Sequence, residues 1–150
     1  MKLDKSGIDL ITKWEGLKLK PYLCSANVPT IGYGSTYYEN GRKVMLTDAN
    51  ITKDRAVELF ENTVKTYEAG VLSLLGSIKV NQNQFNALVS FAYNLGLKAL
   101  KNSTLLKLVK LNQNDKRIAV EFGKWVNAGG KKVQGLVNRR NDEIKMYYKV

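Results

Sequence analysis

The sequence contains no histidine and only one cysteine. A single cysteine cannot form a disulfide within the chain, and without histidine there is no Cys/His zinc cluster, Ser-His-Asp triad or Cys-His dyad. Histidine is also the side chain whose charge ordinarily changes near neutral pH. Any acid or base that works at neutral pH must therefore be a carboxyl, thiol or amine whose surroundings perturb it.

Long apolar runs are also missing, because no stretch approaches the roughly 20 residues that span a bilayer. The first residues, MKLDKSGIDL, are too polar for the apolar part of a secretory signal. We therefore expect no export signal and no stable insertion into a membrane. With 150 residues, 44% of them hydrophobic and 25% charged, the chain is typical of one globular domain.

Acidic side chains are scarce, with 13 against 24 basic ones and a net charge of +11. This excess favours an anionic partner, either nucleic acid or the polyanionic envelope of a bacterium. The basic residues are scattered rather than gathered in one run, and no nucleic-acid-binding motif is present. Charge alone leaves both partners open.

A short amphipathic helix is predicted near the start of the chain, with Ser6 as its N-cap and Gly16 at its end. Ile8 and Ile11 lie at helical spacing from Glu15, which places Glu15 beside the apolar face. Partial burial and the negative end of the helix dipole both disfavour an anion. The position therefore suits a proton donor, although a plain ion pair with a nearby cation is an alternative.

Three residues with side chains that can take part in catalysis occur at a Glu-x8-Cys-x5-Thr spacing, namely Glu15, Cys24 and Thr30. This layout puts a possible acid at a helix end and two nucleophilic or water-holding side chains on the next segment, as in a hydrolase. Only the thiolate form of cysteine is a strong nucleophile or base, so nearby cations such as Lys18 or Lys20 would help. By itself such a spacing also arises by chance.

The remaining pattern predicts β structure followed by helices. Residues 22–47 read as strands with a hairpin turn at Asn40-Gly41, and Gly32 leaves room for a close backbone approach. A long amphipathic helix is predicted over 52–75, with a possible bend at Gly70. Further helices are expected from Asn81-x-x-Gln84, which resembles a capping box, and near 103–112, 115–124 and 136–148.

Several words of the sequence carry a family resemblance. WEG, PY and TIGYG occur in this order around Glu15 and Thr30, and they are followed by ITKDRAVELF (51–60), NQNQFNALVSFAYNLG (81–96), NSTLL (102–106), KW (124–125) and GGKKVQGLVNRRNDE (129–143). From about residue 6 onward the chain resembles the phage lysozymes, the endolysins of glycoside hydrolase family 24 that cleave peptidoglycan.

The resemblance implies an α+β lysozyme fold in a single domain over residues 1–150. A small N-terminal lobe, roughly 13–58, would hold a β-hairpin. A larger helical lobe would comprise 1–12 plus 70–150, and the helix at about 52–75 would join the two.

The resemblance also implies roles for individual residues. Glu15 matches the catalytic glutamate and would be the general acid. Cys24 stands where the commonest pattern has aspartate, and Thr30 matches a threonine placed to hold a water beside the sugar. Cys24 and Thr30 would activate or position water for attack with inversion, which we favour, or the thiolate would attack the sugar directly. A buried, inert cysteine is the alternative.

Tyr93 and Ser103 match positions that contact the substrate in the family, although an N-cap role for Ser103 is at least as plausible. Ser35 stands where many relatives have a histidine that is a structural partner, so we expect activity to be retained.

Two further groups read as structural. Trp125 fits the core better than a sugar platform, and Arg139, Arg140 and Glu143 fit a structural salt bridge.

The expected function is hydrolysis of the β-1,4 bond between N-acetylmuramic acid and N-acetylglucosamine, without metal or organic cofactor. The protein would be a monomer that binds peptidoglycan and not nucleic acid. It would accumulate in the cytoplasm of a bacterial host and reach the wall through a lesion made by a holin. A lytic transglycosylase that uses Glu15 alone and a non-catalytic wall-binding relative are alternatives.

Overall fold

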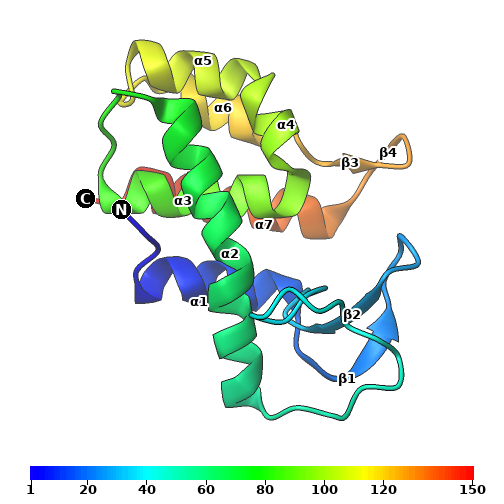
Figure 1. Ribbon diagram of the computed structural model, residues 1–150. Coiled ribbons are helices and arrows are strands. Elements are labelled where there is room, and N and C mark those ends of the chain that lie inside the picture. Colours follow the sequence, from blue (N-terminus) through cyan, green and yellow to red (C-terminus); the bar gives the residue numbers. More distant parts are fainter. The chain divides into compact units, whose positions relative to one another are not determined.

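The computed structural model describes residues 1–150 and combines seven helices with two small antiparallel sheets (Figure 1). This is the α+β class expected from the sequence. No helix is both long and apolar enough to cross a bilayer. The elements in chain order are α1 (Lys5–Glu15), β1 (Lys18–Leu23), β2 (Pro29–Gly32), α2 (Lys53–Leu75), α3 (Gln82–Leu95), α4 (Leu97–Lys101), α5 (Thr104–Leu111), α6 (Arg117–Gly123), β3 (Asn127–Ala128), β4 (Lys131–Lys132) and α7 (Gln134–Tyr147).

The chain forms two compact units, here called the hairpin unit (residues 12–66) and the helical unit (residues 1–11 and 67–150). Their boundaries fall inside α1 and α2, so each of these helices contributes residues to both units.

The hairpin unit is built on the antiparallel pair β1–β2. Its core consists of Ile31, Val44 and Leu59, with Tyr38 and Ile51 packed against them.

Gly32 in β2 has φ +70°, and a Cβ there would lie 3.3 Å from the Cβ of Ala56 on α2. The close approach expected at this glycine is therefore present, because an added Cβ would be in tight contact with α2, and a φ of this sign favours glycine.

The strands expected over 22–47 are only partly right. β1 begins earlier, at Lys18, and the segment after β2 forms two isolated bridges, Ile31↔Ser35 and Tyr37↔Lys43, instead of continuous strands. The turn near Gly41 is present, with φ +85° at that residue. Side chains replace the missing ladder, because the Asp48 carboxylate accepts hydrogen bonds from the Tyr38 hydroxyl, the Met45 amide and the Arg42 guanidinium.

Asn81 and Gln84 form the expected capping box of α3. At the start of α2 the Thr52 hydroxyl accepts the Arg55 amide, a cap that the sequence pattern had not indicated. The expectation for Ser6 is wrong. With Ser6 as N-cap the helix would begin at Gly7, but α1 starts two residues earlier, at Lys5, because the Asp4 carboxylate accepts the Gly7 amide at 3.0 Å.

The helical unit is organised around α3, which is buried over most of its length and packs along α7 (Figure 1). The salt bridge expected on α7 is present and buried. Glu143 lies 2.7 Å from Arg140 Nε and 3.5 Å from Arg139 Nε, and Ser90 on α3 donates a hydrogen bond to Glu143. The short helix α4 was not foreseen. At Gly70, a Cβ would lie 2.5 Å from the Leu97 side chain, so close packing with α4 gives a reason for glycine at this position of α2.

Candidate active site

Glu15 is the last residue of α1 and is half-buried. Gly16 follows it with φ +69°, a left-handed conformation that ends the helix at little cost for glycine. The chain then enters β1 at Lys18. The carboxyl therefore lies at the negative end of the helix dipole, as the sequence pattern predicted.

Cys24 follows the last residue of β1 and opens the tight loop that joins β1 to β2. Its amide donates to the Val28 carbonyl at 3.1 Å, and its carbonyl accepts the Asn27 amide at 2.9 Å. Asn27 has φ +60°, which asparagine tolerates better than most residues. Two backbone hydrogen bonds thus fix the position from which the half-exposed thiol projects.

Thr30 lies in β2 on the other side of this loop, and its side chain is almost fully buried. Its hydroxyl donates to the Val28 carbonyl at 2.8 Å. The same hydroxyl is close enough to the Cys24 sulfur to favour the ionised form of the thiol.

The pKa of the Cys24 thiol is lowered, chiefly by a backbone hydrogen bond from Val28, followed by those from Ala26 and from the Thr30 hydroxyl. Each of these groups stabilises the thiolate more than the thiol. The hydrogen bonds of the loop therefore favour the thiolate, a role that the sequence had suggested for the lysines at 18 and 20.

Tyr22 is a site residue that the sequence reasoning missed. The pKa of its phenol is raised, first by partial burial and then by the negative charges of Cys24 and Glu15. Tyr22 also pairs with Thr30 in the β ladder. Residues two apart on a strand share a face, so the proximity of Tyr22 to Cys24 could have been read from the sequence. Its proximity to Glu15 required the fold.

Ser35, which stands where many relatives have histidine, is fully buried in the hairpin unit. Its hydroxyl lies 2.9 Å from the hydroxyl of Thr63 on α2, and Thr63 in turn donates to the Leu59 carbonyl. A short hydroxyl pair thus satisfies this buried polar position without histidine.

The two predicted substrate contacts belong to the helical unit. Tyr93 on α3 is half-buried, and its ring lies 4.9 Å from that of Tyr67 at a 56° tilt. Ser103 is the N-cap of α5, because its hydroxyl accepts the Leu106 amide at 3.0 Å and donates to the Leu100 carbonyl at 2.6 Å. The N-cap alternative is therefore confirmed.

Ser103 also lines a pocket of about 360 Å³ in the helical unit, together with Asn102, Thr104, Glu121, Lys124 and Trp125. Trp125 is half-buried and meets Phe91 edge to face at 5.4 Å, so it belongs to the core on one side and to the pocket on the other. Glu121, which the sequence reasoning did not single out, is ion-paired with Lys124 at 2.8 Å. Aromatic and hydrogen-bonding groups in one wall are suited to a sugar.

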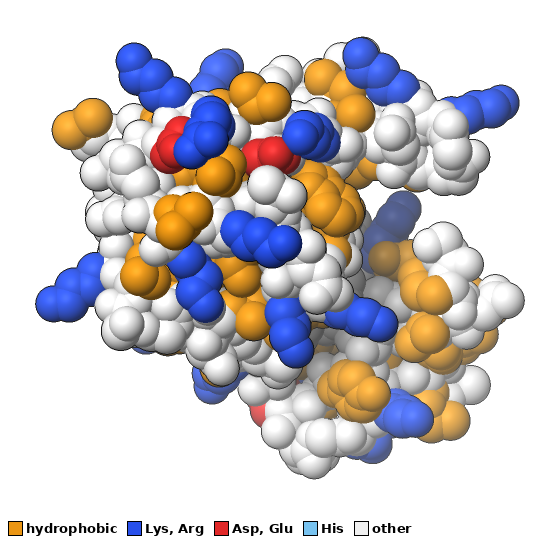
Figure 2. All heavy atoms as spheres, turned by 90° about the horizontal axis from the view of Figure 1, so that it is seen from above, with side chains coloured by type: hydrophobic (Ala, Val, Ile, Leu, Met, Phe, Trp, Pro, Cys, Tyr) orange, Lys and Arg blue, Asp and Glu red, His pale blue; other side chains and the backbone are white.

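Positive charge is spread over the face of the molecule that Figure 2 shows. Figure 2 shows one face on which lysine and arginine side chains stand singly among apolar and neutral atoms, with few acidic side chains between them. Such a surface attracts polyanions broadly and does not form one compact anion site.

Comparison with known proteins places the chain in a family. The family model "Phage lysozyme" matches residues 12–143. An endolysin of Bacillus phage B103 is 40% identical over 98% of this chain, which spans 54% of that relative's length. An endolysin of Acyrthosiphon pisum secondary endosymbiont phage 1 is 35% identical over 98% of both chains.

Among solved structures, an endolysin from Escherichia coli O157:H7 phage FAHEc1 matches with a TM-score of 0.86 and 35% identity, covering 99% of this chain and 94% of that one. Both the sequence and the fold therefore agree with the resemblance first read from the motifs around Glu15 and Thr30. The chain belongs to the phage lysozyme family.

Proposed function

We propose that this chain is a muramidase that hydrolyses the β-1,4 bond between N-acetylmuramic acid and N-acetylglucosamine in peptidoglycan. Its membership in the phage lysozyme family supports this activity. The observation that carries the proposal is the shared anchoring of Cys24 and Thr30, whose amide and hydroxyl donate to the same Val28 carbonyl. This pair lies in the same unit as the helix-terminal Glu15 and close to Tyr22, whose pKa is raised by burial and by the charges of Cys24 and Glu15.

Glu15 acts as the general acid in this proposal. Cleavage of a glycosidic bond requires a proton on the leaving oxygen while positive charge develops on the sugar ring. Glu15 is half-buried at the C-terminal end of α1, and its carboxyl supplies the proton that the leaving oxygen takes.

Cys24 and Thr30 activate the attacking water. The thiolate accepts a proton from water, the water oxygen bonds to the anomeric carbon, and the leaving oxygen departs with the proton of Glu15. The Thr30 hydroxyl, held beside the sulfur by its bond to Val28, orients the water. Direct attack with inversion follows from this assignment. Attack by the sulfur itself, with retention, is the alternative.

Tyr93 and Ser103 contribute substrate contacts in the same proposal. The Ser103 hydroxyl is engaged with the Leu100 carbonyl and the Leu106 amide, so its contact with a sugar uses a remaining lone pair. The pocket around Ser103 and Trp125 offers an aromatic edge and the Glu121 carboxylate beside it. The net charge of +11 favours adsorption to an anionic wall.

The proposal extends to the biology of the protein. Relatives of this chain are named endolysins. We infer that the protein accumulates as a monomer in the cytoplasm of a bacterial host and reaches the wall through a membrane lesion made by another protein. We also infer that its two units act as the two lobes of one lysozyme domain.

The decisive experiment is product analysis on purified peptidoglycan. Wild type should release reducing sugars with an inverted anomeric form, Glu15→Gln should lower the rate by about 10²-fold or more, and Cys24→Asp should remain active. Full activity of Glu15→Gln would contradict the mechanism. Anhydro sugars would point to a lytic transglycosylase, and wall binding without any cleavage would point to a non-catalytic relative.

A further inference from the structure

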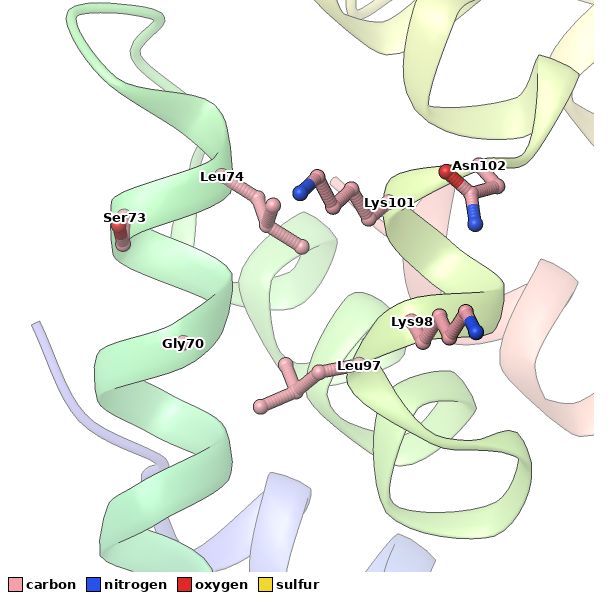
Figure 3. A pocket seen from close by; sticks show the side chains of 7 residues that line it. All are labelled: Gly70, Ser73, Leu74, Leu97, Lys98, Lys101 and Asn102. Atoms are coloured by element: carbon pink, nitrogen blue, oxygen red, sulfur yellow. The ribbon is translucent and has the colours of Figure 1, made fainter.

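A second pocket of the helical unit lies between α2 and α4 and has a volume of about 610 Å³. That size is typical of a site for a small molecule or short peptide. Figure 3 shows the residues that line it, which are Gly70, Ser73, Leu74, Leu97, Lys98, Lys101 and Asn102. None of the predicted site residues is among them.

The walls of this pocket are apolar on facing helices. Leu74 projects from α2 and Leu97 from α4, and both side chains are half-buried. Gly70 allows the approach, because any Cβ at that position would overlap the Leu97 side chain at 2.5 Å. The pocket therefore has a fixed apolar floor where the two helices meet.

Its charge is of one sign. Lys101 extends from α4 toward Leu74, whereas Lys98 and Asn102 point to the other side of α4 (Figure 3). No acidic residue lines the pocket, and neither lysine forms an ion pair or a side-chain hydrogen bond in the protein. Both lysines lie in the last turn of α4, where a positive charge is favourable because of the helix dipole. The dipole does not explain why an apolar pocket lies next to the Lys101 ammonium.

We propose that the pocket between α2 and α4 binds a short peptide that has small apolar side chains and a free carboxylate. Leu74 and Leu97 would contact the methyl groups, and the Lys101 ammonium would bind the carboxylate.

The peptide stem of peptidoglycan has this chemistry, because it contains alanine methyl groups and free carboxylates. This identification rests on the proposed muramidase function. Under this identification the peptide stem binds in the pocket between α2 and α4, separately from the site that binds the sugar chain.

The test is calorimetric titration of the purified full chain with a synthetic stem pentapeptide that ends in a free D-alanine carboxylate. The same peptide with a C-terminal amide and inorganic phosphate serve as the other probes. Wild type should bind the acid at least tenfold more tightly than the amide, because the amide loses a charge-assisted hydrogen bond. Phosphate should not compete at equal concentration.

Matched variants locate the site. Lys101→Gln should weaken binding about tenfold. Lys110→Gln, which removes an equally exposed lysine from the last turn of α5, should leave it unchanged. Leu74→Ser should also weaken binding, in contrast to Leu72→Ser on the same helix outside the pocket. Equal loss in Lys101→Gln and Lys110→Gln would overturn the site, because net charge alone would then explain binding.

Equal affinity for the acid and amide peptides, effective competition by phosphate, or no binding by wild type would each overturn the proposal. Glu15→Gln should bind the pentapeptide as wild type does. If wild type cleaves glycan but does not bind the peptide, the peptide site alone is refuted. If wild type binds the peptide but does not cleave glycan, the muramidase activity alone is refuted.

Discussion

The Cys24 amide and the Thr30 hydroxyl donate to the same Val28 carbonyl, at 3.1 and 2.8 Å, across the closed end of the β1–β2 hairpin. The Thr30 hydroxyl is also in contact with the Cys24 sulfur and helps to lower the pKa of the thiol. One loop thus positions a thiol and the hydroxyl that stabilises its ionised form.

The ionisation of Cys24 should depend on this contact. Its pKa is lowered because hydrogen-bond donors favour the thiolate, so Thr30→Val should raise the pKa back toward the ordinary thiol value. The rate of alkylation by iodoacetamide as a function of pH measures this midpoint. Thr30→Ser, which keeps the hydroxyl, is the control, and a midpoint that does not move in Thr30→Val would contradict the role of the hydroxyl.

The phenol of Tyr22 should report the charge on Glu15. Negative charge nearby disfavours the phenolate and raises the Tyr22 pKa, so Glu15→Gln should lower that pKa. NMR titration of ring-labelled tyrosine, with Tyr22→Phe to assign the signal, measures the shift without reference to activity. The same Tyr22 pKa in wild type and Glu15→Gln would mean that the two groups are not coupled.

The Ser103 hydroxyl should stabilise the fold whether or not it contacts substrate. Ser103→Ala removes the N-cap of α5 and should lower the free energy of unfolding by about 1 kcal/mol in urea titration. Ser103→Asp can restore the cap. If Ser103 also binds substrate, KM should stay raised in a variant whose stability is restored. An alanine variant as stable as wild type would refute the capping role.

The buried Glu143 should be the costliest single charge to remove from α7. It is fully buried and neutralises Arg140, which is itself without exposed surface. Glu143→Ala leaves that guanidinium unpaired and should cost about 3–5 kcal/mol of unfolding free energy. Chemical denaturation measures the loss, and a cost below about 1 kcal/mol would contradict a structural role for this ion pair.

The Glu39–Arg55 ion pair on the surface should contribute much less to stability than the buried Glu143–Arg140 pair. The Arg55 guanidinium binds both carboxylate oxygens and lowers the Glu39 pKa to about 2. Because the folded-state pKa is depressed, the stabilisation is present above the ordinary pKa and is lost as pH falls toward about 2. Glu39→Gln should therefore cost at most about 1 kcal/mol at pH 7 and progressively less in acid. A pH-independent cost would contradict this.

Much of the fold could be predicted from local sequence patterns, because the features concerned are determined by residues close together in the chain. The capping box at Asn81, the turn at Gly41 and the α2 helix depend on residues a few positions apart. The expectations that failed depended on distant partners. Asp48 holds the segment after β2 through side chains, and α4 is placed by contacts such as that between Leu97 and Gly70.

The sequence by itself determined the chemistry available to this protein. It excluded histidine and disulfide mechanisms, and it placed Glu15 at a helix end with Cys24 and Thr30 at spacings that resemble a known family. Only the tertiary structure decided what surrounds these groups. Hydrogen bonds across the β1–β2 loop, and not neighbouring lysines, favour the Cys24 thiolate, because strand pairing brings backbone amides and the Thr30 hydroxyl to the sulfur.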